Sequence, residues 1–309
     1  MSKILVTGAD LAPQALALLE GYEMVYAGKT PTEQSLVALC REHNPVAIIV
    51  RYGGVGAAMM DAAPALKVIS KHGSGTDTID KVAAQARGIE VVAALGVNAA
   101  AVAEQTMALL LACAKSVVAL DARMRAGHWD KATHKSLELG GRTVGLVGLG
   151  AIGLRFARMA DAMGMRVIGF DPYARNLPDY VQGVELETLW RESDVISLHC
   201  PLTADNRGLL GEATLAQCKR GVIVVNTARG GLIDEDALLA AVRSGQVMAA
   251  GLDSFAAEPM AAGHPFQGEP RIVLSPHIGG VTSDAYVNMG LGAARNVLQV
   301  LERSAEAAH

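Results

Sequence analysis

The feature that most constrains the fold is the alternation of two kinds of segment along the whole chain. Short apolar runs lie at 4–6, 46–50, 66–70, 89–92, 143–148, 165–170, 194–200, 221–226 and 271–276. They are almost continuously apolar, which is typical of parallel strands covered on both faces. Alanine- and leucine-rich stretches at 11–20, 33–42, 79–87, 151–163 and 235–243 predict helices between them. The alternation predicts an α/β protein with two doubly wound parallel sheets.

The two series of segments also predict how the chain is divided. Residues 98–126 are expected to form one long helix that ends at Gly127, and residues 284–303 a helix that closes the chain. Two such helices would let the chain pass between domains twice. We therefore expect a flavodoxin-like domain built from 1–97 and 284–309, with a second doubly wound domain of residues 98–283 inserted into it.

Composition narrows the classes of function. A net charge of −4 gives no basic stripe that would favour nucleic acid or an anionic membrane. The four cysteines lack metal-ligand spacing, so no metal site is expected, and their sparseness suits a reducing cytoplasm. The N-terminal apolar run is too short for a signal peptide, and the most apolar long stretch contains Glu104, Gln105 and Lys115. We expect a cytoplasmic protein that neither binds nucleic acid nor spans a membrane.

A glycine-rich loop joins a predicted strand to a predicted helix in the inserted domain. Its Gly148, Gly150 and Gly153 have the spacing of a dinucleotide-binding loop. There the first glycine permits a tight turn, the second lets the backbone approach a pyrophosphate, and the third lets the helix pack closely. The next strand ends at Asp171, and a carboxylate there binds the adenosine ribose hydroxyls and repels a 2′-phosphate. The loop predicts a Rossmann domain that binds NAD, with NADP less favoured and Arg175 as the one nearby feature that suits it.

Three charged residues follow apolar runs in the same domain, namely Arg229, Glu258 and His277. Ligands of open α/β sheets bind beyond the carboxyl ends of the strands, so the fold is expected to bring the three together. Each residue also has an ordinary structural interpretation. Arg229 can pair with Asp234 or Asp236, Glu258 can cap a turn, and a single histidine is often only exposed.

The three residue types suit hydride transfer to a carbonyl group. Histidine titrates near neutral pH and can supply the proton that the carbonyl oxygen needs. A carboxylate hydrogen-bonded to the imidazole fixes its orientation and favours its charged form. Arginine binds a carboxylate through two hydrogen bonds and stabilises negative charge on the reacting oxygen. Together with a dinucleotide, these groups predict an NAD-dependent oxidoreductase that acts on 2-hydroxy acids.

The motifs around these residues resemble those of the D-isomer-specific 2-hydroxyacid dehydrogenase family, of the phosphoglycerate dehydrogenase and hydroxypyruvate reductase type. They are GLVGLGAIG at 145–153, HCPLT at 199–203, NTARGGLIDEDAL at 226–238, GLDSFAAEP at 251–259 and SPHIGG at 275–280. Their order and spacing fit the family over essentially the whole chain. The resemblance implies that 1–97 with 284–309 is the substrate domain, and that the protein is a homodimer.

The resemblance also implies roles that spacing alone does not give. Arg229 would bind the substrate carboxylate and carbonyl, His277 would be the acid/base catalyst, and Glu258 would be its partner. Ser74 and Gly75, in the loop KHGSGTD, would offer backbone N–H groups to the substrate carboxylate. Asp253 would hold the nicotinamide carboxamide. The cofactor-binding residues implied in this way are Gly148, Gly150, Ala151, Ile152, Gly153, Asp171, Cys200, Pro201, Thr203, Thr227 and Asp253.

The sequence leaves the substrate open between alternatives. The leading hypothesis is reduction of a small 2-keto acid such as hydroxypyruvate or glyoxylate. Arg51 stands where phosphoglycerate dehydrogenases of the family carry a substrate-binding arginine, so a 3-phosphoglycerate dehydrogenase is the alternative, and a solvated strand-end arginine is the structural reading. The chain departs from the family pattern at Thr78, in the stretch 93–104 and at Asn206, none of them catalytic positions. An alternative of a different class is an NAD(H)-sensing binding protein similar to corepressors. Such proteins keep the catalytic residues, so only a measurement of turnover distinguishes this alternative from an enzyme.

Overall fold

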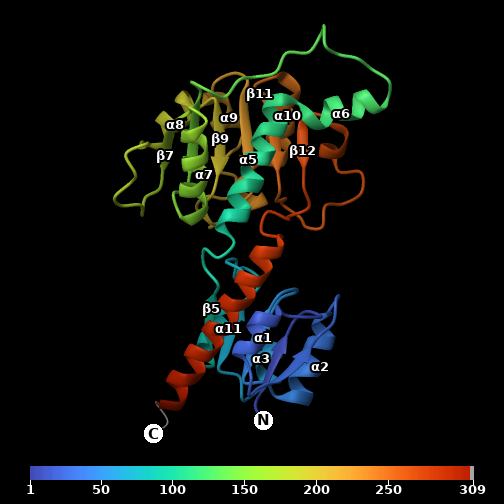
Figure 1. Ribbon diagram of the computed structural model, residues 1–309, viewed down its shortest axis with the longest axis vertical. Helices are drawn as coiled ribbons and strands as arrows, with labels where there is room; N and C mark the ends of the chain where they lie inside the picture. The colour runs from blue at the N-terminus through green and yellow to red at the C-terminus, as the bar shows by residue number, and fades with distance from the viewer. Residues whose placement is uncertain (307–309) are drawn as a thin grey trace. The chain divides into compact units, whose positions relative to one another are not determined.

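The computed structural model describes residues 1–306 and divides the chain into two compact units (Figure 1). The first unit comprises Met1–Asn98 together with the chain from Gly280 onwards, and the second comprises Ala99–Gly279. Each unit contains one parallel sheet with helices on both faces. Within residues 1–306 no helix is both long enough and apolar enough to cross a membrane.

The first unit has a five-stranded sheet in the order β2-β1-β3-β4-β5, with every neighbouring pair parallel. Its strands are β1 (Lys3–Val6), β2 (Glu23–Tyr26), β3 (Ala47–Val50), β4 (Val68–Lys71) and β5 (Glu90–Ala93), and its helices are α1 (Pro13–Leu18), α2 (Glu33–His43), α3 (Ala57–Asp61), α4 (Lys81–Ala86) and α11 (Ser283–Glu306). Side chains of β3 alternate between the two faces. Ile48 and Val50 pack with α2, α3 and α4, whereas Ile49 packs with α1 and α11.

The second unit has a seven-stranded sheet in the order β12-β11-β10-β9-β6-β7-β8, again parallel throughout. Its strands are β6 (Thr143–Val147), β7 (Arg166–Phe170), β8 (Val181–Gly183), β9 (Val195–Leu198), β10 (Val222–Asn226), β11 (Val247–Leu252) and β12 (Ile272–Leu274). Its α-helices are α5 (Ala99–Lys115), α6 (Val117–Arg125), α7 (Ala151–Ala162), α8 (Leu186–Glu192), α9 (Glu212–Gln217) and α10 (Glu235–Ser244), and its 3-10 helices are η1 (Gly230–Leu232) and η2 (Pro265–Gly268). One face of the sheet packs on α5 and α7, the other on α8, α9 and α10.

The two strand orders are those of the flavodoxin-like and Rossmann folds, so the predicted fold class is confirmed. Local sequence explains several helix ends. Helix α2 begins at a capping box, in which Thr32 and Ser35 bond each other's backbone N–H groups at 3.2 and 3.0 Å. Helix α10 begins at Asp234, whose side chain accepts a hydrogen bond from the Ala237 N–H, and ends at Gly245 in the left-handed region.

Two features of the structure differ from the sequence-based expectation. The single long helix predicted over 98–126 is wrong, because Ser116 takes a left-handed conformation (φ 53°) and separates α5 from α6. Strands β2 and β8 were not predicted, and β11 lies in a stretch that was recognised as an apolar run but not included in the series of predicted strands. Strands β2 and β8 are edge strands, which are covered less completely and therefore need less apolar sequence.

Candidate active site

All the predicted site residues of the second unit lie beyond the carboxyl ends of its strands. Gly148 follows β6 and Asp171 follows β7, while Cys200 lies just after β9. Beyond β10 lie Thr227 and Arg229, beyond β11 lie Asp253 and Glu258, and beyond β12 lies His277. Because the strands are parallel, these ends share one edge of the sheet, which is where open α/β sheets bind ligands.

The glycine loop between β6 and α7 has the geometry of a phosphate cradle. Gly148 has a φ of 99°, and a Cβ on it would lie 2.7 Å from the carbonyl carbon of His199. A Cβ on Gly153 would lie 2.2 Å from the Gly148 oxygen, so α7 can pack here only with glycine. Gly150 instead faces open space, with no atom within 4 Å of its Cβ position. The loop therefore leaves room for a pyrophosphate at the N-terminus of α7, where the N–H groups of Ala151, Ile152 and Gly153 begin the helix.

Asp171 ties the glycine loop to the end of β7. Its Oδ2 accepts a hydrogen bond from the Leu149 N–H at 2.9 Å, and its Oδ1 accepts one from the Tyr173 N–H at 2.9 Å. The carboxylate is half-buried and keeps lone pairs for a further donor such as a ribose hydroxyl. Arg175 is exposed and donates to the carbonyl groups of Pro172 and Ala174.

The loop after β9 is held by a residue that departs from the family pattern. Asn206 accepts a hydrogen bond from the Thr203 N–H at 2.7 Å and donates to the Pro201 oxygen at 2.8 Å. These bonds close the loop on itself beside Cys200, and burial raises the pKa of that thiol. Thr227, on the next strand end, is buried and shares a 2.8 Å hydrogen bond with Thr106 of α5.

The loop that carries Arg229 is built by its neighbours. Asn226 is fully buried at the end of β10, where it accepts from the Ala228 N–H at 3.0 Å and donates to the Arg229 oxygen at 2.9 Å. A Cβ on Gly230 would lie 1.9 Å from the carbonyl carbon of Phe255. Only glycine therefore lets the Arg229 loop lie against the loop that leads from β11 to Glu258. Nη1 of Arg229 donates to the Ala228 oxygen at 2.8 Å, and the side chain is half-buried.

Glu258 and His277 are joined directly, although 19 residues separate them in the chain. Oε2 of Glu258 lies 2.6 Å from Nδ1 of His277, and Oε1 accepts a hydrogen bond from the Phe255 N–H at 2.9 Å. The carboxylate thus caps its own loop and orients the imidazole at the same time. The His277 side chain is 47% exposed, so a ligand can reach the imidazole. This pair is an imidazole with one nitrogen fixed by a carboxylate and the other able to exchange a proton.

The segment around His277 is anchored by the buried carboxylate of Asp253. Its oxygens accept hydrogen bonds from the Ile278 N–H at 3.0 Å, from the Gly279 N–H at 2.7 Å and from the Ser275 hydroxyl. Asp253 is 1% exposed, so these bonds satisfy a carboxylate that water barely reaches. They hold His277 in a left-handed conformation (φ 54°), which is unfavourable for a residue with a Cβ and needs such support.

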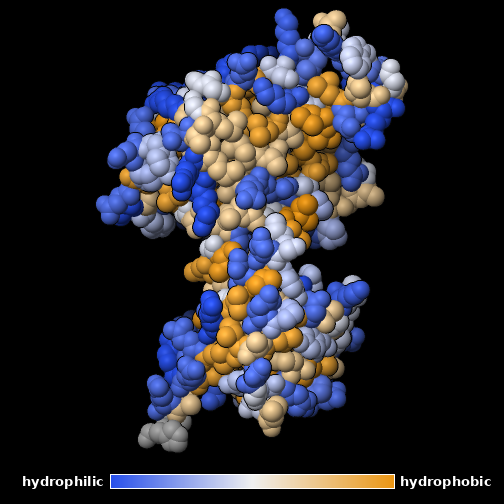
Figure 2. Space-filling view, viewed as in Figure 1, coloured by the Kyte–Doolittle hydropathy of each residue, from blue (hydrophilic) through white to orange (hydrophobic). Residues whose placement is uncertain are grey.

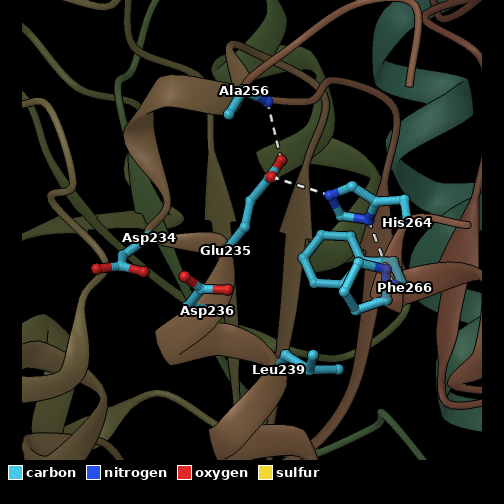
Figure 3. A pocket seen from close by; sticks show the side chains of 8 residues that line it. Asp234, Glu235, Asp236, Leu239, Ala256, His264 and Phe266 are labelled. Atoms are coloured by element: carbon cyan, nitrogen blue, oxygen red, sulfur yellow. Dashed lines mark hydrogen bonds and ion pairs between the residues drawn. The ribbon is translucent and has the colours of Figure 1, made fainter. Parts of the chain in front are cut away.

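A pocket is lined by Ala256 of the loop that leads to Glu258, together with residues of α10 and of the segment 264–266 (Figure 3). Glu235 reaches from α10 to the loop, where it accepts the Ala256 N–H at 2.8 Å and lies 3.3 Å from Nε2 of His264. His264 in turn accepts the Phe266 N–H at 3.3 Å, and the two rings lie edge to face at 4.8 Å. We interpret this cluster as the support of the loop that presents Glu258.

The predicted site residues of the first unit lie at the carboxyl edge of its own sheet. Ser74 and Gly75 follow β4, and the Ser74 hydroxyl is 3.3 Å from the Asn98 side-chain oxygen. Arg51 follows β3 and forms an ion pair with Asp10.

Four supporting residues were not assigned a role from the sequence. Asn226 and Ser275 lie within the quoted motifs, and a polar residue at the end of a buried strand was the available signal. Glu235 also lies within a quoted motif, but it and Asp10 bond to residues 21 and 41 positions away, and no local pattern indicates such partners.

Comparison with known proteins shows which family the chain resembles over most of its length. The family profile described as "D-isomer specific 2-hydroxyacid dehydrogenase, NAD binding domain" matches residues 107–279. A hydroxypyruvate reductase of Thermotoga maritima is 41% identical over 249 residues, which are 80% of this chain and 81% of that protein. A D-3-phosphoglycerate dehydrogenase of Mycobacterium leprae is 39% identical over 298 residues, which are 95% of this chain but 56% of that protein. The chain thus spans little more than half the length of that mycobacterial relative.

The fold has close counterparts among solved structures. A crystal structure of a Thermus thermophilus protein superposes with a TM-score of 0.90 at 38% identity and covers 97% of both chains. Because it covers 97% of this chain, the similarity extends over both units.

Proposed function

The chain belongs to the D-isomer specific 2-hydroxyacid dehydrogenase family, and we propose that it reduces a small 2-keto acid with a nicotinamide cofactor. Membership of this family was predicted from the motifs and is confirmed. The prediction that the protein is a dehydrogenase with an NAD-binding domain is also confirmed. The observation that carries the proposal is the 2.6 Å contact between His277 and Glu258, at the same sheet edge as Arg229 and the glycine loop. This arrangement supplies a proton donor, its orienting carboxylate and an anion clamp beside a dinucleotide cradle.

In the proposed reaction the nicotinamide supplies a hydride to the carbonyl carbon when it is bound in its reduced form. His277 gives the proton from Nε2 to the carbonyl oxygen, so that the product is the neutral hydroxyl group. Glu258 holds Nδ1 and so keeps the imidazole oriented for the transfer. In the reverse direction the neutral imidazole accepts the hydroxyl proton through the same nitrogen.

Arg229 is proposed to bind the substrate carboxylate and to stabilise charge on the reacting oxygen. Its planar guanidinium offers five N–H donors in a fixed geometry, which suits a carboxylate and a neighbouring oxygen together. Asn226 and Gly230 fix the backbone on either side of it. The backbone N–H groups of Ser74 and Gly75, in the first unit, are proposed as further ligands of the substrate carboxylate.

Asp171 supports NAD rather than NADP as the cofactor. The half-buried carboxylate lies at the end of β7 and would repel a 2′-phosphate, while it accepts hydrogen bonds from ribose hydroxyls. The pyrophosphate is proposed to bind at the start of α7, to Ala151, Ile152 and Gly153. The adenosine side of the site is proposed to be lined by Cys200, Pro201 and Thr203. The nicotinamide is proposed to lie toward Thr227 and Asp253.

For the substrate, we propose a small unphosphorylated 2-keto acid of the hydroxypyruvate or glyoxylate type. The Thermotoga maritima relative, which this chain matches over 81% of its length, is named a hydroxypyruvate reductase. The alternative of a 3-phosphoglycerate dehydrogenase rests on relatives of that name and on Arg51. An NAD(H)-sensing role without turnover is the remaining alternative, and a single assay of turnover separates it from both enzymes.

A homodimer is proposed from the surface of α5 and α6. Helix α6 has no buried residue, and Val117, Val118, Met124 and the nearby Trp129 are all more than half exposed. Figure 2 shows apolar atoms gathered over α5 and its junction with α6. A second copy of the chain would cover such a patch, which is unusual on a monomer. The double variant Val118→Lys/Met124→Glu should elute at half the mass of the wild type in light-scattering chromatography, and an unchanged mass contradicts the proposal.

The variant Arg229→Lys tests the proposed function. Lysine keeps the charge but not the planar pair of donors, so we expect kcat/KM to fall by about 10²-fold or more. NADH binding, followed by fluorescence, should not change. The matched control is Arg243→Lys, at the exposed end of α10, which should retain wild-type kinetics. A near-normal kcat/KM in Arg229→Lys would remove Arg229 from the reaction.

A further inference from the structure

The first unit has a charged cluster where its strand order reverses. Strand β1 lies beside β3, and the chain leaves β1 towards β2 on one side and β3 towards β4 on the other. Doubly wound sheets bind ligands at such a switch point, beyond the carboxyl ends of the strands. Asp10 follows β1 and Arg51 follows β3, so the pair stands at this point. The loop with Ser74 and Gly75 follows β4, the next strand along the same edge.

Arg51 is held by an anion of the protein itself. Its Nη1 donates to the Asp10 backbone oxygen at 2.7 Å and forms an ion pair with Asp10 Oδ1. The guanidinium carbon lies 5.2 Å from the centre of the Tyr52 ring and 5.0 Å from that of Tyr286. The Arg51 side chain is only 12% exposed, whereas that of Asp10 is 65% exposed. The cation is therefore largely enclosed, and the Asp10 carboxylate is the charged group that solvent or a ligand meets first.

The carboxylate is stabilised as an anion by two partners. The Tyr286 hydroxyl donates to Asp10 Oδ1 at 2.9 Å, and this bond, followed by those from Arg51, lowers the pKa of Asp10. Tyr286 lies in α11, so the cluster joins both ends of the chain. A group that displaces Asp10 from Arg51 must also replace the bond from Tyr286.

The neighbouring histidine adds no positive charge near neutral pH. His72 is 8% exposed, and its ring lies 5.7 Å from that of Tyr286. Burial, together with the positive charges of Arg51 and Lys71, lowers the pKa of His72 to about 4. The charge of Arg51 is thus balanced by Asp10, and no second cation arises from this imidazole.

We propose that Asp10 is a specificity residue that weakens the binding of phosphorylated 2-keto acids to this unit. A phosphate at the switch point would either displace Asp10 from Arg51 and Tyr286 or lie beside its negative charge. Both cost binding energy, since like charges in contact repel and an ion pair must be broken. The hydroxymethyl group of hydroxypyruvate and the hydrogen of glyoxylate are uncharged, so they are not repelled by Asp10 and need not break its ion pair with Arg51. The inference rests on the proposed reduction of 2-keto acids, and it assigns Arg51 to the internal pair rather than to substrate phosphate.

The first test compares two substrates in the variant Asp10→Asn. Asparagine keeps the size of the side chain and an acceptor for Arg51 but removes the negative charge. The ratio of kcat/KM for 3-phosphohydroxypyruvate to that for hydroxypyruvate should rise at least about tenfold, mainly through KM. The matched control is Asp61→Asn, which breaks an exposed Asp–Arg pair of the same unit (Asp61–Arg87, 2.8 Å) and should leave the ratio unchanged. Asp10→Ser provides a second variant if Asp10→Asn folds poorly.

A second test does not depend on turnover. Inorganic phosphate is titrated by calorimetry into the full chain saturated with NADH, so that the cofactor's own phosphate cradle is occupied. Asp10→Asn should bind phosphate at least about tenfold more tightly than the wild type, and Asp10→Asn/Arg51→Gln should lose that gain.

The proposal is overturned if the wild type already prefers the phosphorylated acid, or if both Asp10 variants leave the ratio and the phosphate affinity unchanged. If the wild type reduces no 2-keto acid, the proposed function fails, and the phosphate titration still decides the role of Asp10.

Discussion

At the residue scale, the site depends on one unfavourable backbone conformation. His277 has a φ of 54°, and the Asp253 carboxylate holds the backbone on its C-terminal side through Ile278 and Gly279. The imidazole is fixed from a different direction, by Glu258. Backbone and side chain are thus constrained separately, which is what a proton donor needs if its position is to be set before the substrate binds.

The positions of many candidate site residues were predictable because polar and charged residues are concentrated at strand ends. The glycine loop, Asp171, Arg229, Glu258 and His277 each follow an apolar run, and the parallel sheet brings those ends together. Asp10 was not predictable in the same way. Its partner Arg51 is 41 residues away, and they meet only because β1 and β3 are neighbours in the sheet.

The preference for NAD over NADP is predicted to depend on Asp171. In Asp171→Ala the repulsion of a 2′-phosphate is lost, so the preference for NAD over NADP, as a ratio of kcat/KM values, should fall at least about tenfold. The structure adds that alanine also removes the acceptor of the Leu149 N–H, so the glycine loop loses a support. Asp171→Asn keeps an acceptor and separates the two effects. A cofactor ratio that is unchanged in both variants would exclude Asp171 from the adenosine site.

The stability of the folded protein is predicted to depend on pH through His72. Its pKa is lowered to about 4 in the folded protein, against about 6.5 in an unfolded chain. Between these values the unfolded chain binds more protons than the folded one, so stability falls as the pH drops through this window. The loss should be on the order of 3 kcal/mol. Within residues 1–306, Nε2 of this imidazole has no hydrogen-bond partner, which leaves its proton without compensation.

Urea unfolding at a series of pH values checks this prediction. In His72→Leu the free energy of unfolding should depend less steeply on pH between about 4 and 6.5. The exposed His128 offers a control, since His128→Leu should retain the wild-type slope. Equal slopes in the wild type and His72→Leu would show that His72 does not cause the effect.

At the element scale, the sequence indicated most of the buried strands, whereas two of the four edge strands, β2 and β8, gave no clear signal. Central strands such as β10 are buried at every position, and their continuous apolar runs are easy to recognise. The edge strands β2 and β8 carry exposed residues and lack that signal. The break between α5 and α6 falls at Ser116, where no glycine or proline marks it, so no local signal in the sequence indicates the break.

The contact between two loops gives the element-scale prediction. Gly230→Ala places a Cβ 1.9 Å from the Phe255 carbonyl carbon, so the Arg229 loop and the Glu258 loop must move apart. Because small misplacements of catalytic groups are costly, kcat/KM should fall by roughly 10²-fold, with the melting temperature also lowered. Gly268→Ala in η2 is the matched control, since no atom lies within 4 Å of its Cβ position. Wild-type kinetics in Gly230→Ala would mean that the loops do not set each other's position.

At the scale of the whole molecule, both strand orders are consistent with a general rule. Successive parallel strands are joined by right-handed crossovers, and a change in direction along the sheet places helices on both faces. The alternation of apolar runs therefore predicted the two doubly wound units, although not the boundaries of every element. Assignment of the first unit to substrate binding stays a prediction, because it rests on the family resemblance of Ser74, Gly75 and Arg51.

The most direct test of the central claim follows NADH oxidation by its near-ultraviolet absorbance with four acids in parallel, namely hydroxypyruvate, glyoxylate, pyruvate and 3-phosphohydroxypyruvate. The account predicts rapid oxidation with hydroxypyruvate or glyoxylate, at least about tenfold slower turnover of the phosphorylated acid, and loss of activity in His277→Gln with NADH still bound. A clear preference for 3-phosphohydroxypyruvate would contradict the proposed substrate and the role of Asp10. Binding of NADH without turnover of any of the four acids would contradict the proposed reaction and favour the sensing role.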